Sequence, residues 1–360
     1  MNELSVFLLL CVNVHFARGT ISKGNKFDKC DDCMPISKCK EALPYADMTD
    51  ENLKHLSPFF CGVTSSFNVC CSKLKDPKAV EASTRANQRR AKLRLLPDSC
   101  GNIYNSIQLR IIAGVFAKIY EYPWMVLIAY NTGEGVKFKC SGTLINSRYV
   151  LTAAHCLHHA DINSTRIGEY EIGKATDCHD YVCESNLQDI NVQKQIIHEN
   201  YTHYNHYVND IALLRLENDV DMSYKNTGTI CLPITEELQN RAIFNRFATV
   251  AGWGNTEFHK ESVSLLKVII PVRSNEDCED FYGEKPSSKL KKFCAGMYRK
   301  DSCTGDSGGP LMIEDSYKGE SKVVQFGIVS SGPIKCGSSV PGLYTDVRQY
   351  VDWILDNIEE

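Results

Sequence analysis

The sequence predicts an all-β fold for residues 111–360, closed by a C-terminal helix and preceded by a small cysteine-rich region. Short apolar segments separated by turns carry the β prediction, because such runs are typical of antiparallel strands. They are residues 124–130, 149–152, 211–216, 248–252 and 323–329. Near the C-terminus the spacing of apolar residues becomes helical. These residues are Val347, Val351, Ile354, Leu355 and Ile358.

Length and composition indicate an exported globular protein. At 360 residues the chain exceeds one typical domain, so two domains, or one large domain with an appendage, are expected. The charged share of 23% and the net charge of −4 give no reason to expect a nucleic-acid partner. Seventeen cysteines are hard to reconcile with a reducing cytosol and favour an oxidising compartment.

The N-terminus predicts a signal peptide over residues 1–19. Residues 6–14 form an apolar run that is too short to span a bilayer, and Ala17-Arg18-Gly19 offers small residues to a signal peptidase. Glu3 stands where a basic residue is usual, and a membrane anchor is the alternative. When Cys11 leaves with the signal, sixteen of the seventeen cysteines remain, an even number that suits disulfides.

Two interpretations fit the cysteine-rich segment, residues 20–71. Cys30 and Cys33 have the spacing of a zinc ligand pair, whereas the adjacent Cys70-Cys71 and the predicted export favour a module held by disulfides. The six cysteines allow about fifteen pairings, which the spacing does not resolve. They are Cys30, Cys33, Cys39, Cys61, Cys70 and Cys71.

Residues 72–110 lose the apolar periodicity and carry many basic side chains between positions 73 and 94. An exposed, flexible linker is the expected structure, and a polyanion-binding patch is the alternative. The segment contains Cys100 and ends at Arg110.

The chemistry of the chain is expected at residues 301–310, which read Asp-Ser-Cys-Thr-Gly-Asp-Ser-Gly-Gly-Pro. The hydroxyl of Ser307 lies in a run of small residues where the backbone can turn tightly. The amides of this run can then point at a bound substrate, as the donors of an oxyanion hole do. Because serine is a poor nucleophile without a base, a histidine and an acid are expected elsewhere.

His155 and Asp210 are the candidates for that base and acid. His155 follows the strand-like residues 149–152, and Asp210 leads into the apolar run Ile211-Ala212-Leu213-Leu214. Three motifs in a fixed order are far more specific than a lone Gly-x-Ser-x-Gly.

In the order His, Asp, Ser, these segments resemble the chymotrypsin-type serine proteases of the S1 family over residues 111–360. The resemblance implies two packed, antiparallel, six-stranded β-barrels with the catalytic triad between them. It implies that Ser307 attacks a peptide carbonyl while His155 moves the proton to the leaving amine. Asp210 would hold the imidazole tautomer, and the amides of Gly305 and Ser307 would receive the oxyanion.

The same resemblance implies activation by proteolysis. In the family a basic residue before Ile-Ile marks the cleaved bond, and Leu109-Arg110-Ile111-Ile112 fits that pattern. A cut after Arg110 would free the α-ammonium of Ile111 to pair with the carboxylate of Asp306. The uncut chain would therefore be a zymogen. Ala113 is a departure, since the family usually has glycine there.

The resemblance also implies a substrate preference, through the position of one acidic residue. Asp301 stands six residues before Ser307, where the family has the base of its primary pocket, so cleavage after Arg or Lys is expected. Gly332 and Gly342 would keep the pocket walls open for a long side chain. Ser331 replaces the family's usual aromatic residue and alters the wall along the substrate backbone.

A second resemblance concerns the N-terminal cysteines. Cys33-Met34-Pro35-Ile36-Ser37-Lys38-Cys39, a gap to Cys61, and Val69-Cys70-Cys71 are similar to the clip domain of arthropod serine proteases. Disulfides implied for this domain are Cys30–Cys70, Cys33–Cys61 and Cys39–Cys71. Those implied for the remainder are Cys140–Cys156, Cys278–Cys294, Cys303–Cys336, Cys178–Cys183 and Cys100–Cys231. The last of these would keep the clip fragment attached after cleavage.

Three surface features complete the prediction. Asn163 and Asn200 begin N-x-Ser/Thr sequons and are expected glycosylation sites in a secreted protein. Glu169 and the acidic loop after it resemble a region where some family members bind calcium. A solvated loop without metal is the favoured alternative.

These motifs predict a secreted, extracellular serine endopeptidase zymogen of an innate-immune cascade, of the melanization or Toll-ligand type. Expected partners are an upstream protease, a protein substrate and serpin-type inhibitors, with no nucleic acid, no membrane and no cofactor for the chemistry. The alternative is a weakly catalytic or non-catalytic clip-domain protein that binds cascade partners. Such homologues usually lose the catalytic serine, which this chain keeps. A digestive trypsin is disfavoured by the clip domain and the linker.

Overall fold

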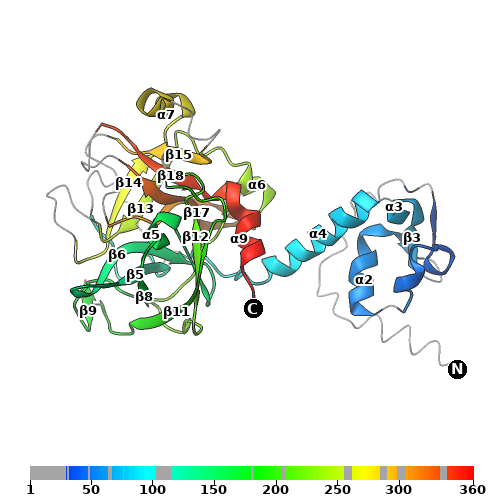
Figure 1. Cartoon of the computed structure of the whole chain (residues 1–360), viewed down its shortest axis with the longest axis horizontal. Coiled ribbons are helices and arrows are strands. Elements are labelled where there is room, and N and C mark those ends of the chain that lie inside the picture. Colours follow the sequence, from blue (N-terminus) through cyan, green and yellow to red (C-terminus); the bar gives the residue numbers. More distant parts are fainter. Residues whose placement is uncertain are drawn as a thin grey trace. The chain divides into compact units, whose positions relative to one another are not determined.

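The structure is a computed structural model that falls into two compact units, residues Met1–Arg90 and Ala91–Glu360 (Figure 1). It describes residues 30, 32–47, 49–63, 67–75, 77–102, 115–179, 182–203, 207–254, 262–283, 290–297, 305–332 and 339–360. The predicted signal peptide lies outside these ranges. Within them, every helix is too short or too polar to cross a membrane.

The first unit contains a small antiparallel sheet in which β3 lies between β1 and β2. The strands are β1 (Cys33–Pro35), β2 (Phe60–Val63) and β3 (Phe67–Cys70). The helices are η1 (Ile36–Lys38), η2 (Leu43–Tyr45), α2 (Asp50–Leu56), η3 (Ser57–Phe59) and α3 (Cys71–Lys75). A small apolar core holds them together, with Leu56 and Val69 fully buried.

Disulfides supplement this small core. The structure joins Cys30 to Cys70, Cys33 to Cys61 and Cys39 to Cys71. These are the pairs that the clip resemblance implies, and they leave no thiolate of this set for zinc. A unit of this size buries too little apolar surface to be stable by packing alone, so the covalent links are needed.

The segment predicted as a flexible linker is more ordered than expected. Helix α4 (Pro77–Leu93) occupies a large part of it, which its alanine, arginine and lysine residues, all good helix formers, explain. After the helix, Leu96 and Cys100 are buried in the core of the second unit. The backbone of Gly101 forms hydrogen bonds with Thr229 and Val323. The linker prediction was therefore wrong for residues 94–102, which belong to the catalytic unit.

The first half of the second unit is a closed antiparallel barrel in the order β11-β12-β7-β6-β5-β8. Its strands are β5 (Met125–Thr132), β6 (Gly135–Leu144), β7 (Tyr149–Thr152), β8 (Ile162–Ile167), β11 (Gln188–Ile197) and β12 (Ala212–Leu216). A two-stranded hairpin of β9 (Asp177–His179) and β10 (Val182–Glu184) lies between β8 and β11 in the chain. The predicted strands at 124–130, 149–152 and 211–216 coincide with β5, β7 and β12.

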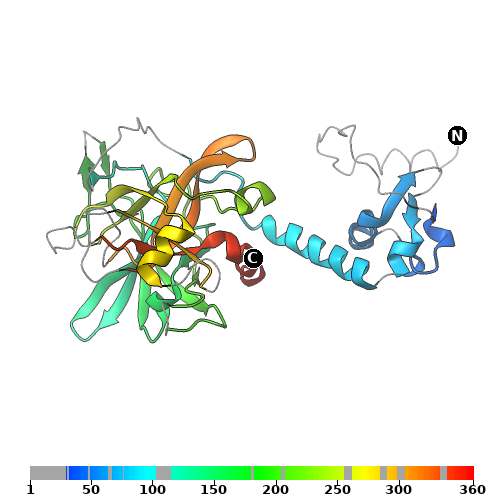
Figure 2. The same ribbon diagram turned by 90° about the horizontal axis from the view of Figure 1, so that it is seen from above.

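The second half is an antiparallel sheet in the order β15-β18-β17-β16-β13-β14-β4. Its strands are β4 (Val115–Phe116), β13 (Phe247–Gly252), β14 (Leu266–Pro271), β15 (Lys292–Ala295), β16 (Pro310–Tyr317), β17 (Glu320–Ser331) and β18 (Gly342–Asp346). The sheet curls until Val272, just after β14, bridges Ala295 at the end of β15. Figure 2 shows β16 and β17 as one long orange hairpin. The predicted chymotrypsin-like pair of barrels is confirmed, with the second barrel closed only by this short contact.

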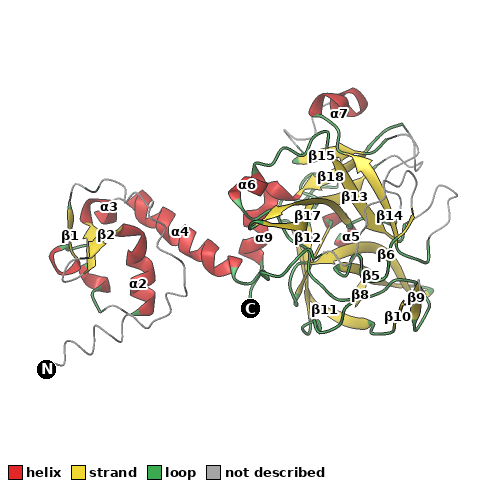
Figure 3. Cartoon of the chain, turned by 180° about the vertical axis from the view of Figure 1, so that it is seen from behind, coloured by secondary structure: helices red, strands yellow, loops and turns green. Residues whose placement is uncertain are grey.

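Helices are few in this unit, as the strand-dominated view in Figure 3 shows. Those within the described ranges are α5 (Ala154–Leu157), α6 (Glu236–Gln239), α7 (Asn275–Tyr282), η4 (Val347–Tyr350) and α9 (Val351–Asn357). The predicted C-terminal helix is confirmed as η4 and α9, and all five apolar residues that predicted it are buried.

One apolar core extends through both barrels. Polar groups also cross the interface between them: Thr143 of β6 donates a hydrogen bond to Gln325 of β17, at 2.7 Å and out of contact with water. The two barrels are thus fixed to each other, and side chains at their interface can be positioned accurately.

Candidate active site

His155 and Asp210 meet at the interface between the barrels. His155 lies in α5, directly after β7, and Asp210 precedes β12, which pairs with β7. The His155 Nδ1 atom lies 2.8 Å from Asp210 Oδ2, and the His155 amide donates to Asp210 Oδ1 at 2.8 Å. Two hydrogen bonds therefore fix the position of the carboxylate relative to the ring.

The second barrel holds Asp210 as well. Thr345 of β18 donates to the Asp210 carbonyl at 2.8 Å, and the hydroxyl of Ser330, in β17, donates to Oδ2. Asp210 is 0% exposed. Burial alone would raise the pKa of its carboxyl, but His155, Lys292 and Ser330 together hold that pKa below its usual value. The acid is thus kept ionised away from water, where its charge acts most strongly on the imidazole.

Ser307 lies in a turn that two glycines make possible. Gly305 and Gly308 have φ values of +101° and +77°, a conformation that side chains disfavour. A Cβ atom on Gly308 would lie 2.2 Å from Thr152 Oγ1 and 3.2 Å from Cys156 Sγ. Ser307 also accepts a hydrogen bond at its carbonyl from the Ser141 amide, at 2.8 Å. The loop that carries Ser307, the candidate nucleophile, therefore packs against residues that precede and follow His155 in the sequence.

Ser307 and His155 share no hydrogen bond, although the structure describes both residues. Catalytic hydrogen bonds are often long before substrate binds and shorten in the complex. This geometry therefore fits a triad whose bond between serine and histidine has yet to form.

Asp306 points its carboxylate beneath the backbone of a neighbouring loop. Its Oδ1 accepts from the Gly254 amide at 2.9 Å, and a Cβ on Gly252 would lie 2.2 Å from the same oxygen. The predicted activation partner, Ile111, and the predicted cleavage residue, Arg110, lie outside the described residues.

The predicted specificity pocket is described in part. Gly332 and Gly342 lie next to each other, so that a Cβ on Gly332 would be 3.6 Å from the Gly342 Cα. Asp301 and the pair Cys303 and Cys336 lie outside the described residues. The part of the wall that the structure describes is therefore built from two residues without side chains.

Among the residues that the structure describes, four other disulfides belong to the second unit. They are Cys140–Cys156, Cys278–Cys294, Cys100–Cys231 and Cys178–Cys183. The first fixes the residue next to His155 to β6, and the third joins the segment after α4 to the catalytic unit. The last closes the hairpin of β9 and β10. These pairs also match those that the resemblance implies.

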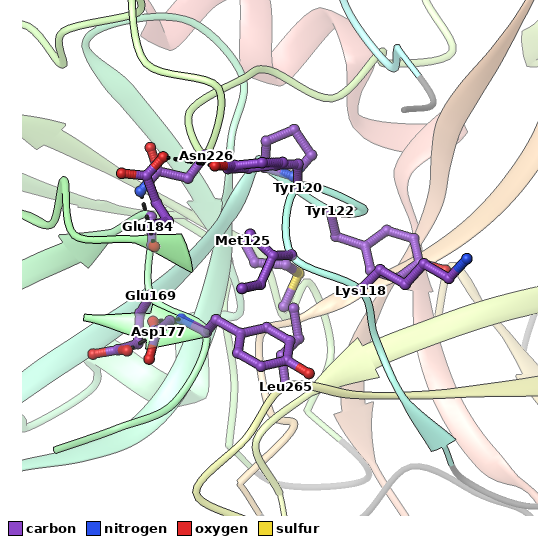
Figure 4. A pocket seen from close by; sticks show the side chains of 13 residues that line it. Lys118, Tyr120, Tyr122, Met125, Glu169, Asp177, Glu184, Asn226 and Leu265 are labelled. Carbon is purple, nitrogen blue, oxygen red and sulfur yellow. Dashed lines mark hydrogen bonds between the residues drawn. The ribbon is translucent and has the colours of Figure 1, made fainter. Parts of the chain in front are cut away.

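The loop after Glu169 forms an enclosed acidic pocket (Figure 4). Glu169 and Asp177 are 5% and 2% exposed, and both accept from the Tyr170 amide at 3.1 Å. Burial and Asp177 raise the pKa of Glu169, while Arg166, 3.3 Å from its carboxylate, opposes the shift. The buried Oδ1 atoms of Asp177 and Asn226 have no hydrogen-bond partner among the described residues. Carboxylate and amide oxygens are the kind of ligand that Ca²⁺ takes in proteins.

Both predicted glycosylation sites are exposed. Asn163 lies in β8 and its side-chain amide donates to Asn131, and Asn200 follows β11. A glycan at either asparagine would extend into solvent without disturbing the core.

Several residues around the triad were missed by the sequence analysis. Ser330 and Thr345 hold Asp210, and the ring of Tyr207 stacks on His155 with 5.3 Å between centroids. Lys292, fully buried, donates to Ser330. These residues lie far apart in the sequence in ordinary strand and loop patterns, so no local signal could have identified them.

The comparisons with known proteins agree with this site. The Trypsin family model matches residues 111–354. The CLIP domain-containing serine protease HP8 of Bombyx mori is 34% identical over 98% of this chain and 98% of its own length. Serine protease grass of Drosophila melanogaster is 35% identical over 91% of this chain and 88% of its own.

A solved structure extends the likeness to three dimensions. The crystal structure of the Drosophila Grass clip serine protease of the Toll pathway matches with a TM-score of 0.67 and 33% sequence identity, over 90% of this chain and 93% of that one. The likeness covers the cysteine-rich first unit as well as the two barrels. The chain therefore belongs to the trypsin family and, within it, to the clip-domain serine proteases.

Proposed function

We propose that the protein is a secreted serine endopeptidase zymogen, which is activated by cleavage after Arg110 and then cleaves other proteins after Arg or Lys. The observation that carries this proposal is the pair formed by the half-buried His155 and the buried Asp210, with 2.8 Å between Nδ1 and Oδ2, beside the loop of Ser307. A base oriented by a buried acid next to a serine in a tight turn is the arrangement that acyl transfer requires.

In this mechanism each residue acts through the contacts described above. Asp210 holds the proton on His155 Nδ1, which leaves Nε2 free to accept the proton of Ser307. The serine oxygen attacks the carbonyl carbon, and the amides of Gly305 and Ser307 donate to the oxyanion. His155 then gives the proton to the leaving amine, and water hydrolyses the acyl-enzyme by the same path.

Selectivity for Arg or Lys rests on Asp301, supported by the bare wall at Gly332 and Gly342. Zymogen activation rests on the sequence at Arg110 and Ile111 and on the position of Asp306, whose carboxylate accepts from the Gly254 amide at 2.9 Å. The solved structure of Grass is that of a clip serine protease of the Toll pathway, which supports a place in an extracellular innate-immune cascade of the melanization or Toll-ligand-processing type. Its partners would be an upstream protease, a substrate that is itself a zymogen or ligand precursor, and serpin-type inhibitors. The disulfides of both units support secretion.

The test is to cut purified zymogen after Arg110 and follow hydrolysis of an arginyl amide, with Ser307→Ala as the control. Activity should emerge only after the cut, and the serine variant should lose on the order of 10⁶ in turnover. An equivalent substrate with a P1 glutamate should not be cleaved. An inactive protein after confirmed cleavage, with Ile111 as the new N-terminus, would favour the alternative of a clip-domain binding cofactor.

We also propose that the acidic pocket binds a structural Ca²⁺ through Glu169, Asp177 and Asn226. Two buried carboxylates against one guanidinium leave an excess of negative charge, which a divalent cation would neutralise. The ion would stabilise the loop and take no part in the chemistry.

Thermal unfolding of the full chain with Ca²⁺ or with a chelator tests this site. The melting temperature should rise with Ca²⁺, and the rise should vanish in Glu169→Gln. Glu171→Gln is the matched control, because this half-exposed carboxylate pairs with Lys174 at 2.8 Å and should leave the Ca²⁺ response unchanged. Equal melting temperatures with and without Ca²⁺ would rule the site out.

A further inference from the structure

Lys292 is a fully buried cation that the mechanism above does not use. It lies in β15, where all four residues are buried, and its side chain is 0% exposed. A buried ammonium is costly unless hydrogen bonds and an opposite charge compensate for lost water. Two of the groups that compensate for Lys292, the hydroxyl of Ser330 and the carboxylate of Asp210, belong to the candidate active site.

A chain of hydrogen bonds leads from Lys292 to the catalytic histidine. Lys292 Nζ donates to Ser330 Oγ at 2.6 Å, and Ser330 Oγ donates to Asp210 Oδ2, the oxygen 2.8 Å from His155 Nδ1. An ammonium has three donors and no acceptor, so it must occupy a lone pair of the Ser330 hydroxyl. The hydroxyl proton is then left for Asp210. Lys292 therefore fixes the direction of the Ser330 bond.

The register of the sheet reinforces this arrangement. Lys292 of β15 lies directly opposite Thr345 of β18, and Thr345 donates to the carbonyl of Asp210 at 2.8 Å. Neighbouring positions in the second barrel thus hold both ends of Asp210, the carbonyl directly and the carboxylate through Ser330. On the other side, Lys292 Nζ lies 5.8 Å from the centre of the Tyr207 ring, which stacks on His155.

We propose that Lys292 is a positioning residue of the active site, which orients the Asp210 carboxylate through Ser330 and keeps the imidazole of His155 in its neutral, basic form at lower pH. This proposal rests on the protease function proposed above. The electrostatic part of the proposal follows from the repulsion between like charges. A positive charge at Lys292 disfavours a second one on His155, so the ring accepts a proton only at higher acidity.

The ionisation of Lys292 itself is compatible with this role. Burial lowers the pKa of its ammonium to about 8, although Asp210 opposes the shift, so the group is charged at neutral pH. Of the other ionisable groups in this region, Tyr207 faces Lys292, Tyr201 and Tyr350 lie near Asp210, and Asp346, Lys291 and His198 lie farther out around Tyr350. Burial raises the pKa values of Tyr201 and Tyr350, so both stay neutral in the working range. Burial lowers the pKa of His198, and Asp346 is paired with Arg348 at 2.8 Å.

The pH profile of kcat/KM for the protease cut after Arg110 tests the proposal. In Lys292→Met the acid limb should move to higher pH by about half to one unit, the size expected for one charge separated by two hydrogen bonds. KM should not change, because Lys292 is shielded from substrate. Lys291→Met is the matched control: it removes a neighbouring but exposed cation, which lies over the ring of Tyr350, and its profile should overlay that of the wild type.

A second readout does not depend on catalysis. In the Ser307→Ala background, the downfield proton resonance of the His155–Asp210 hydrogen bond can be followed against pH by NMR. The pH at the midpoint of this titration should rise in Lys292→Met and stay unchanged in Lys291→Met. This result is expected even if the protein proves to be no protease. If the methionine variant does not fold, Lys292→Gln replaces it. Coincident midpoints in the folded Lys292 variant and the wild type would overturn the proposal.

Discussion

Asp210 shows how many contacts a single catalytic residue needs. Its two carboxylate oxygens and its carbonyl are all engaged, by His155 from one barrel and by Ser330 and Thr345 from the other. Each contact removes a rotamer in which the acid would fail to face the imidazole. The cost of burying a charge is thus offset by hydrogen bonds that also set its direction.

Gly308 offers a sharp test at this scale. In Gly308→Ala the new methyl group would overlap Thr152 Oγ1 and the Ser141 carbonyl, 2.2 and 2.4 Å away, so the Ser307 loop must move and activity should be lost. Gly319→Ala is the control, because Gly319 has a similar φ of +87° but nothing within 4 Å. It should cost only about 1 kcal/mol in the free energy of unfolding. Active-site titration and thermal unfolding measure both effects, and full activity in Gly308→Ala would contradict this account.

At the scale of elements, the strands and the C-terminal helix could be predicted because their periodicity is local. The triad could be predicted because each member lies in a distinctive motif. Helix α4 could not, since its polar, basic sequence is also that of a solvated linker. Lys292 could not either, because a lysine in a strand is ordinarily exposed. Its burial follows from which strands become neighbours, and no local pattern encodes that.

Leu96 tests the corrected boundary of the catalytic unit. If residues 94–102 were a free linker, Leu96→Ala would be neutral. Because Leu96 is only 8% exposed and packs in the core of the second unit, the substitution should destabilise that unit by about 2–5 kcal/mol. Arg94→Ala, at an exposed position two residues earlier, should change little. Denaturant unfolding of the two variants provides the comparison, and equal stabilities would restore the linker interpretation.

At the scale of the whole molecule, the chain combines a disulfide-held module with a catalytic unit whose two barrels share one core. The first unit has a core of its own, and the second includes the segment that follows α4. The candidate catalytic residues His155, Asp210 and Ser307 all lie in the second unit, so the first contributes none of them.

The Cys100–Cys231 disulfide has a consequence for the first unit. A cut after Arg110 breaks the backbone but leaves the first unit tethered to the enzyme through α4 and residues 94–102. Any partner that binds the first unit is then tethered to the enzyme, which raises its effective concentration there without any new contact. A weak contact there would be enough to select a substrate. Activation would therefore switch on the chemistry without releasing the part of the chain that chooses where it acts.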